Sequence, residues 1–297
     1  MMTERISQWF DLGPVTEIFL QPSSVFILLG LVLLIAARFL KEKVSAYALD
    51  QELTERDNKA VAVENAGFFL AVLLLIAQTY QSSTTGEESP LYLECFAAIG
   101  WSLFAVVLLL VSAWINDRFL LHSFCNTKEL VEDRNVGTGA VIAGSYLASA
   151  FIIGASFQGG SLGNLWLDVL DTLVYFTVGQ VAFLALGVVY QKGSKFDVHA
   201  EIEKDNIAAG VAFGAHLLAM GMILGSHILR SDSLVSLAVW AVLGMVSLLA
   251  TRVLVDRLLL PKSPLDHEIQ VDRNWGAALI EGVCVIGLAV LINASYA

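Results

Sequence analysis

The chain has 297 residues, of which 57% are apolar and only 15% are charged, and its formal net charge is -11. A soluble domain carries about a quarter charged residues, so this composition excludes an ordinary soluble protein. The negative charge argues against a nucleic-acid partner. The partner that the composition does predict is the lipid bilayer.

The first predicted element, residues 1–23, precedes all apolar blocks. Its one basic residue is Arg5, and it has none of the continuous apolar core that a secretory signal contains. Its scattered aromatic and aliphatic residues favour an extracytoplasmic segment that lies at the membrane surface. An ordered loop is the open alternative.

Eight apolar blocks follow, each close to the roughly 20 residues that cross about 30 Å of hydrocarbon as a helix. They lie near residues 24–40, 60–80, 92–115, 136–157, 165–190, 207–228, 233–258 and 275–296. The polar stretches between them are too short for a separate soluble domain. The predicted fold is an all-α polytopic membrane protein with eight transmembrane helices.

A short motif precedes every even-numbered block: one acidic and one basic residue, in either order, followed by asparagine. The asparagines are separated by 77, 71 and 68 residues and are Asn58, Asn135, Asn206 and Asn274. This repeat predicts a two-helix hairpin that is used four times. A longer period of 148 residues, from Asn58 to Asn206, predicts two tandem four-helix domains at 24–160 and 161–297.

Lysine and arginine are concentrated in the segments that follow the odd-numbered spans. Those segments hold 15 of the 17 basic residues, and the exceptions are Arg5 and Arg230. Because short cytoplasmic loops carry the excess of Lys and Arg, we expect the asparagine-bearing loops to be cytoplasmic and both termini extracytoplasmic.

Glycine divides the spans into two kinds, with twelve in the even-numbered blocks and five in the odd-numbered ones. Helices in lipid associate through small residues that let their backbones approach. We therefore expect the glycine-rich even helices to be central and the odd helices to face lipid.

The four asparagines are suited to cap the helices that they precede, because an Asn side chain accepts hydrogen bonds from free N–H groups of the first turn. The acidic residues beside them suit the positive end of the helix dipole. Capping therefore explains both residue types. The functional alternative is a ring of four caps that lines a cytoplasmic mouth.

Polar side chains also occur inside the even spans, two to three turns beyond each asparagine, or about 10–15 Å along the helix. The candidates for a polar path are Glu64, Asn65, Ser145, His216 and Glu281. Ionisable groups at this depth usually face a bundle interior or a watery cavity. They predict either a path for a cation or protons, or interhelical hydrogen bonds that fix how the repeats dock.

Acidic residues at the opposite edge form a third group: Glu94, Asp168 and Asp171. They lie in the first turns of odd spans, where they complement the helix dipole, and a cation-attracting vestibule is the alternative. The three cysteines have no metal-ligand spacing, and no phosphate-binding or nucleophile motif is present. We therefore expect no metal, no cofactor and no enzymatic activity.

The second span of each hairpin opens with Asn, continues with small residues and reaches a Gly eight or nine positions later, at 58–67, 135–144, 206–214 and 274–282. This pattern resembles the DUF350 family, and the chain resembles two tandem copies of it. The resemblance implies a bacterial inner-membrane protein of four spans per copy. It also implies a link to membrane-stress proteins of the phage-shock type. If single-domain relatives dimerise, this chain is a covalent version of that dimer, and a homo-oligomer of the chain is a further expectation.

Two functions follow as hypotheses. The first is a channel or transporter-like protein for a small cation or protons, with Glu64, His216 and Glu281 along the path and Asn65 and Ser145 as polar support. The second is a non-transporting membrane scaffold that recruits a cytoplasmic protein of a membrane-stress system through its charged inner loops.

Overall fold

The computed structural model describes residues 24–83, 90–123, 125–157 and 163–296, so the predicted surface segment at 1–23 lies outside the described residues. Within these described ranges, eight helices are long and apolar enough to cross a membrane. They are α3 (Ser24–Val44), α4 (Lys59–Ser83), α5 (Leu91–Phe119), α7 (Val136–Ser156), α8 (Leu165–Gly193), α10 (Ile207–Ile228), α11 (Leu234–Leu254) and α13 (Trp275–Ser295). The predicted all-α, eight-span fold is confirmed.

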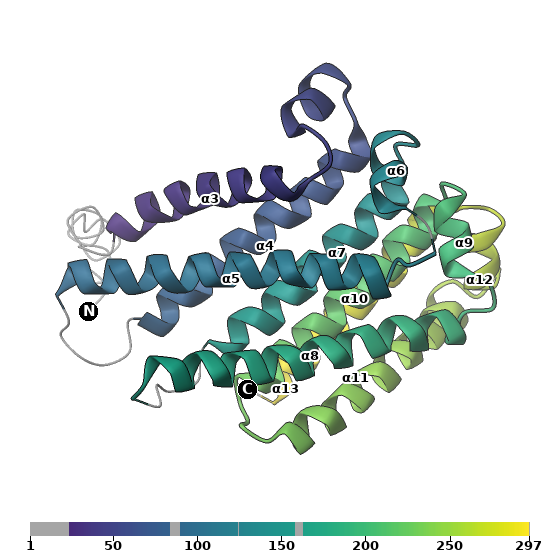
Figure 1. Cartoon of the computed structure of the whole chain (residues 1–297). Helices are drawn as coiled ribbons and strands as arrows, with labels where there is room; N and C mark the ends of the chain where they lie inside the picture. The colour runs from purple at the N-terminus through teal and green to yellow at the C-terminus, as the bar shows by residue number, and fades with distance from the viewer. Residues whose placement is uncertain (1–23, 84–89, 124, 158–162, 297) are drawn as a thin grey trace, which may run out of the picture.

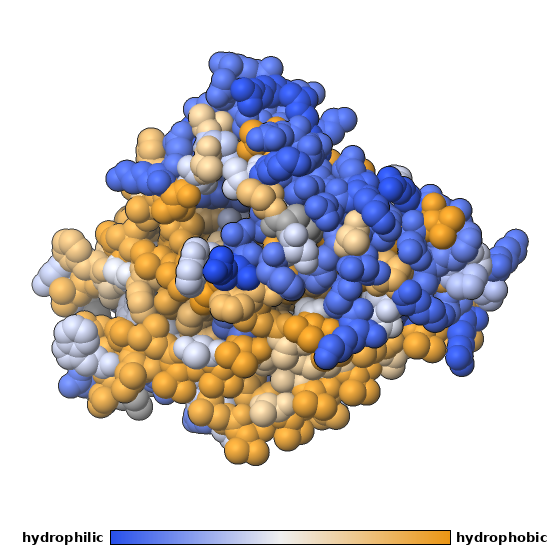
Figure 2. Space-filling view, turned by 45° about the vertical axis from the view of Figure 1, so that its right-hand side comes forward, coloured by the Kyte–Doolittle hydropathy of each residue, from blue (hydrophilic) through white to orange (hydrophobic). Residues whose placement is uncertain are grey.

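Short helical elements connect the two spans of every hairpin. They are η1 (Gln51–Glu55), α6 (Asn126–Val131), α9 (Val198–Glu203), η2 (Val255–Leu259) and α12 (Leu265–Gln270). These elements gather at one end of the bundle (Figure 1), together with the four repeated asparagines. We call this end the Asn end. Figure 2 shows hydrophilic residues concentrated there, next to a broad apolar surface.

The spans form two layers (Figure 1). In one layer α4, α7, α10 and α13 lie side by side in that order, and in the other α3, α5, α8 and α11 lie over one face of this row. The even helices are thus the packed layer, as the glycine distribution predicts. In the most apolar 18-residue stretch of each helix, 72% of α10 is buried but only 33% of α13, which lies at one end of the row.

Glycine sets the spacing within the even row. A Cβ added to Gly144 of α7 would lie 2.3 Å from the carbonyl oxygen of Gly214 in α10. A Cβ on Gly210 would lie 2.3 Å from the carbonyl oxygen of Gly137. The backbones of α7 and α10 are therefore in direct contact, which is the close approach that small residues permit in lipid.

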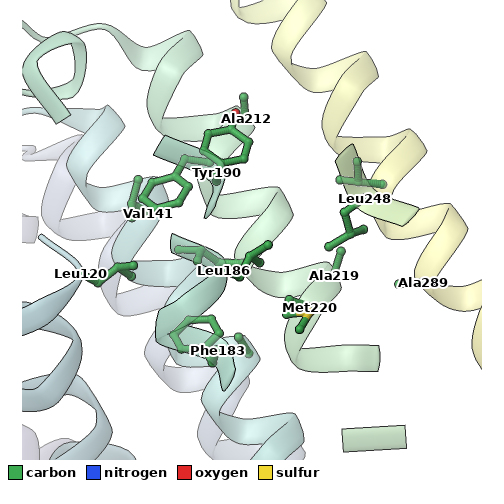
Figure 3. Packing of buried hydrophobic residues seen from close by; sticks show 14 of the residues in the cluster. Leu120, Val141, Phe183, Leu186, Tyr190, Ala212, Ala219, Met220, Leu248 and Ala289 are labelled. Carbon is green, nitrogen blue, oxygen red and sulfur yellow. The ribbon is translucent and has the colours of Figure 1, made fainter. Parts of the chain in front are cut away.

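Large side chains fill the space between the two layers. Figure 3 shows part of this core, with Phe183, Leu186 and Tyr190 of α8 beside Leu120 and Val141. The odd helices turn their other side outward, where residues such as Ile27 and Val235 are 69% and 77% exposed. The odd layer therefore presents the apolar surface that a bilayer requires.

Candidate functional site

Each repeated asparagine caps the helix that follows it. The Oδ1 atom of Asn135 accepts a hydrogen bond from the N–H of Thr138, and that of Asn206 accepts one from Ala209. The residue before each asparagine has a positive φ, and these are the non-glycine residues with that conformation in the described part of the chain: Asp57, Arg134, Asp205 and Arg273. The motif is thus a tight connector between a short element and a long helix.

The amide group of the asparagine has a second role that capping does not predict. The Nδ2 atom of Asn58 donates to the carbonyl of Leu130, that of Asn135 to Ile202, and that of Asn206 to Ile269. Each acceptor belongs to the short element of the next hairpin. The asparagines therefore join consecutive hairpins along the row, and they do not form a ring around a mouth.

The fourth asparagine lacks such a partner. Asn274 caps α13 and donates to Glu268, but it is exposed, and within the described residues its amide reaches no carbonyl of another hairpin. The other three are buried. Three asparagines therefore both cap a helix and join two hairpins, whereas Asn274 only caps a helix, so variants of the two kinds can be compared within one protein.

We predict that Asn135→Ala lowers the free energy of unfolding by about 2–4 kcal/mol. The change removes a cap worth about 1 kcal/mol and leaves the buried carboxylate of Glu129 without its side-chain donor, at about 1–3 kcal/mol. It also removes the side-chain bond to the carbonyl of Ile202, which keeps backbone donors such as the N–H of Asp205. Asn274→Ala removes the cap at an exposed position and should cost about 1 kcal/mol. Unfolding by SDS in mixed micelles measures both. Equal losses would show that the bond between hairpins contributes nothing.

A buried ion pair lies two turns inside the Asn end, between α3 and α4. Lys41 Nζ is 2.5 Å from Glu64 Oε1, and the two side chains are 7% and 5% exposed. The ammonium group also lies over the rings of Phe68 and Tyr146, at 4.5 Å and 4.9 Å from their centroids. Lys41 is thus held by one carboxylate and two aromatic faces.

Three further donors complete the environment of Glu64. Tyr47 and Asn65 donate to Oε2 at 2.6 Å each, and Tyr146 donates to Oε1 at 3.2 Å. Burial, together with the charge of Glu64, raises the pKa of Tyr47, which therefore stays a neutral donor. We call Lys41, Tyr47, Glu64, Asn65 and Tyr146 the first cluster. Every carboxylate oxygen in it has a partner.

A second cluster lies in the other half of the chain. Arg252 of α11 donates to Tyr190 of α8 at 2.8 Å and to Asp266 of α12 at 2.7 Å. Glu281 of α13 is completely buried, with Oε1 at 3.5 Å from Arg252 Nη1 and 3.8 Å from His216 Nε2. Neither oxygen of Glu281 has a hydrogen-bond partner within the described residues.

The structure therefore divides the predicted polar path. Glu64 and Asn65 belong to the first cluster, whereas His216 and Glu281 belong to the second. The close-packed pair α7 and α10 lies between α4 and α13 in the row. Ser145 bonds to the carbonyl of Ile142 within α7.

A lateral cavity of ≈ 600 Å³ adjoins the first cluster. The end of α3, the second half of α5, α6 and the first turns of α7 surround it, and Ser145 is among its lining residues. Lys41, Glu64 and Tyr146 line its inner part. His216 and Glu281 do not line it.

The outer part of this cavity is apolar and reaches the lipid-facing surface. Val107, Val111 and Trp114 of α5 line it there and are 48%, 41% and 67% exposed. Val44 lines the facing edge on α3 and is 68% exposed. Asp117 and Asn126 stand at the polar side, where Asn126 donates a hydrogen bond to Asp117. The cavity therefore has an apolar edge along α5 and α3, an exposed carboxylate at Asp117, and a buried charged end at Lys41 and Glu64.

The predicted acidic edge lies at the end opposite the Asn end. Asp168 and Asp171 are both near the start of α8. Glu94 is in the first turn of α5. Among the described residues no group of three metal-ligating side chains occurs that would hold a metal ion.

Sequence reasoning missed the cations of both clusters. Lys41 and Arg252 count toward the positive-inside pattern, which treats them as loop charges, yet both are buried. A usable signal exists for Arg252, because it lies inside the seventh apolar block, where an ionisable residue is costly. Tyr47 has no comparable signal, since only the folded connector brings it to Glu64.

The fold and its buried clusters define a polytopic α-helical membrane protein assembled from four repeated hairpins. The family model described as Domain of Unknown Function (DUF350) matches residues 16–157 and again residues 164–296. The chain belongs to the DUF350 family and contains two tandem copies of its domain.

Two relatives agree with this assignment. A UPF0719 transmembrane protein of Aquifex aeolicus (strain VF5) is 24% identical over 252 residues, which cover 82% of this chain and 88% of the relative. The UPF0719 transmembrane protein YshE of Bacillus subtilis (strain 168) is 25% identical over 127 residues, which cover 43% of this chain and 93% of the relative. No solved structure matches the chain. The chain is thus a multi-pass membrane protein.

Proposed function

We propose that this protein binds a membrane amphiphile in the lateral cavity, with the apolar part along α5 and the polar group at the buried Lys41–Glu64 pair. The observation that carries the proposal is the combination of an apolar entrance at the lipid-facing surface with a charged inner end. Its volume of ≈ 600 Å³ falls within the range of about 300–1,000 Å³ that small-molecule sites occupy.

The charges of the lining limit the chemistry of the ligand. Among the described residues that line the cavity, Lys41 is the one cation, and Glu64 and Asp117 are the two carboxylates. Because Lys41 is already paired with Glu64, an anionic headgroup would meet a net negative lining. A zwitterionic headgroup with an amine fits better, since its amine is attracted to Asp117 and its phosphate to Lys41.

A path for a small cation or protons receives less support from this geometry. Such a path has to connect Glu64 with His216 and Glu281, which belong to separate clusters on either side of the α7–α10 contact. A cation also has no use for an apolar entrance that opens to hydrocarbon. The second cluster fits the alternative role of fixing how α8, α10, α11 and α13 dock.

We expect Val111→Trp to reduce lipid binding at least about tenfold, which corresponds to about 1.4 kcal/mol. The larger ring would fill the entrance, and Val111 is exposed enough for the fold to tolerate the change. Native mass spectrometry of the protein with added phosphatidylethanolamine or phosphatidylglycerol measures the bound lipid and should show stronger binding of the former.

The matched control is Val242→Trp on α11, a lipid-facing valine that is 58% exposed and does not line the cavity. It should leave lipid binding unchanged. If Val111→Trp and Val242→Trp bound equal amounts of lipid, the lipid would be bound on the lipid-facing surface outside the cavity, and the proposal would be wrong. Preference for phosphatidylglycerol would overturn the headgroup assignment alone.

A further inference from the structure

The contact between α7 and α10 is also the most extensive contact between the two family domains. α7 is the last even helix of the first domain, and α10 is the first even helix of the second. The corresponding helix faces occur again at the two ends of the row. The free face of α13 corresponds to the face of α7 that contacts α10, and the free face of α4 corresponds to the face of α10 that contacts α7. The row therefore has two open ends, one on α13 and one on α4. The corresponding faces of α7 and α10 are packed against each other within the chain.

The positions that face the preceding even helix recur at fixed distances from the asparagine. At four residues beyond it, Gly139 approaches the carbonyl of Ala60, and Gly210 approaches that of Gly137. At eight residues beyond it, Gly214 approaches Ala140. In α4 the same two positions are Ala62 and Ala66, small residues that are exposed, since no other even helix packs against this face of α4 within the described residues.

The positions that face the following even helix recur in the same way. At thirteen residues beyond the asparagine, Ala148 contacts Gly221 of the next helix. In α13 this position is Gly287, around which an added Cβ would meet nothing within 4 Å. α13 thus keeps a small residue where a following helix would pack. Val283 lies nine residues beyond Asn274, at the position that Gly144 occupies in α7, and its larger side chain makes the surface of α13 bulkier at this point.

The joining bond is also incomplete at this end. Asn58, Asn135 and Asn206 donate to a carbonyl four or five residues before the next asparagine, whereas Asn274 has no such acceptor in the part of the chain that the structure describes. Leu53 of η1 lies five residues before Asn58 and so occupies the acceptor position of the first hairpin.

We infer that α13 of one copy packs against α4 of a second copy and extends the even row through the same type of contact that joins α7 to α10. Gly287 would then meet Leu73 of the second copy, which stands at the position of Gly221 and is 42% exposed. Asn274 would donate to the carbonyl of Leu53. The contact is head-to-tail, so it uses different surfaces on the two copies.

Disulfide cross-linking in native membranes tests this register. Leu73→Cys and Gly287→Cys are introduced into separate, differently tagged chains in which Cys95, Cys125 and Cys284 are replaced by serine. We expect a disulfide-linked dimer when the two chains are co-expressed and none when either is expressed alone. A dimer of Gly287→Cys with itself, or no dimer in the mixture, would overturn the proposal.

Two glycine substitutions provide an independent measurement with a matched control. Gly287 and Gly100 both have open space around an added Cβ, but Gly100 lies on α5, in the odd layer. Gly287→Leu should weaken self-association at least about tenfold, and Gly100→Leu should leave it unchanged, as measured by native mass spectrometry in nanodiscs. Equal association of both variants would contradict the inference.

Discussion

Replacing Gly144 by alanine is expected to separate α7 from α10 and to lower the free energy of unfolding by at least about 3 kcal/mol. The added methyl group would lie 2.3 Å from the carbonyl oxygen of Gly214 and 2.8 Å from its Cα. Overpacking costs about 1–3 kcal/mol even where side chains can move aside. Here the neighbour is backbone, so a whole helix has to shift. Unfolding by SDS in mixed micelles measures the loss.

The control for this change is Gly100→Ala. Gly100 is also inside a long helix, but an added Cβ meets nothing within 4 Å. Alanine there should be neutral or stabilise the helix by up to about 1 kcal/mol. If Gly144→Ala were as stable as Gly100→Ala, the backbone contact between the two family domains would not exist in the membrane.

The second large effect is expected for Lys41→Met, which removes the cation of the first cluster. Glu64 would remain buried with its charge uncompensated, and breaking a buried ion pair in this way costs about 3–5 kcal/mol. The double variant Lys41→Met with Glu64→Gln should recover most of the loss, because it replaces the pair by neutral groups. Thermal unfolding in detergent compares the variants.

Lys43→Met is the matched control, since Lys43 is an exposed lysine on the same turn of α3. It should change stability by no more than about 0.5 kcal/mol. If the double variant were no more stable than Lys41→Met, Glu64 would not carry a charge that Lys41 has to balance. The cavity would then have one carboxylate fewer, and its preference for an amine would weaken.

Much of the architecture could be predicted because it depends on local periodicity. The apolar blocks define the spans, since about 20 apolar residues are needed to cross the hydrocarbon. The regularly spaced asparagines define the hairpins, since each one caps the helix that begins the second span of a hairpin. The glycine count identifies the packed layer, because only small residues allow backbone contact in lipid.

The candidate site was predicted less well, because its parts come from different repeats. The helical period brings Glu64 and Glu281 to comparable depths, but it says nothing about which neighbour each one meets. By its sequence position Lys41 counts among the basic residues of a predicted cytoplasmic loop, whereas in the fold its side chain forms a buried ion pair with Glu64. Tyr146 comes from another hairpin, 82 residues away in the chain.

Hydrophobic length and capping are properties of single segments, so the amino-acid sequence is sufficient to predict a membrane protein of eight spans in four repeated hairpins. Three features are seen only in the folded chain: the even helices form an open row, Glu64 and Glu281 lie in separate clusters, and a cavity opens beside Lys41. These features depend on which helix faces meet. Asn135 shows the difference, since its cap is local but its bond to Ile202 joins segments 67 residues apart.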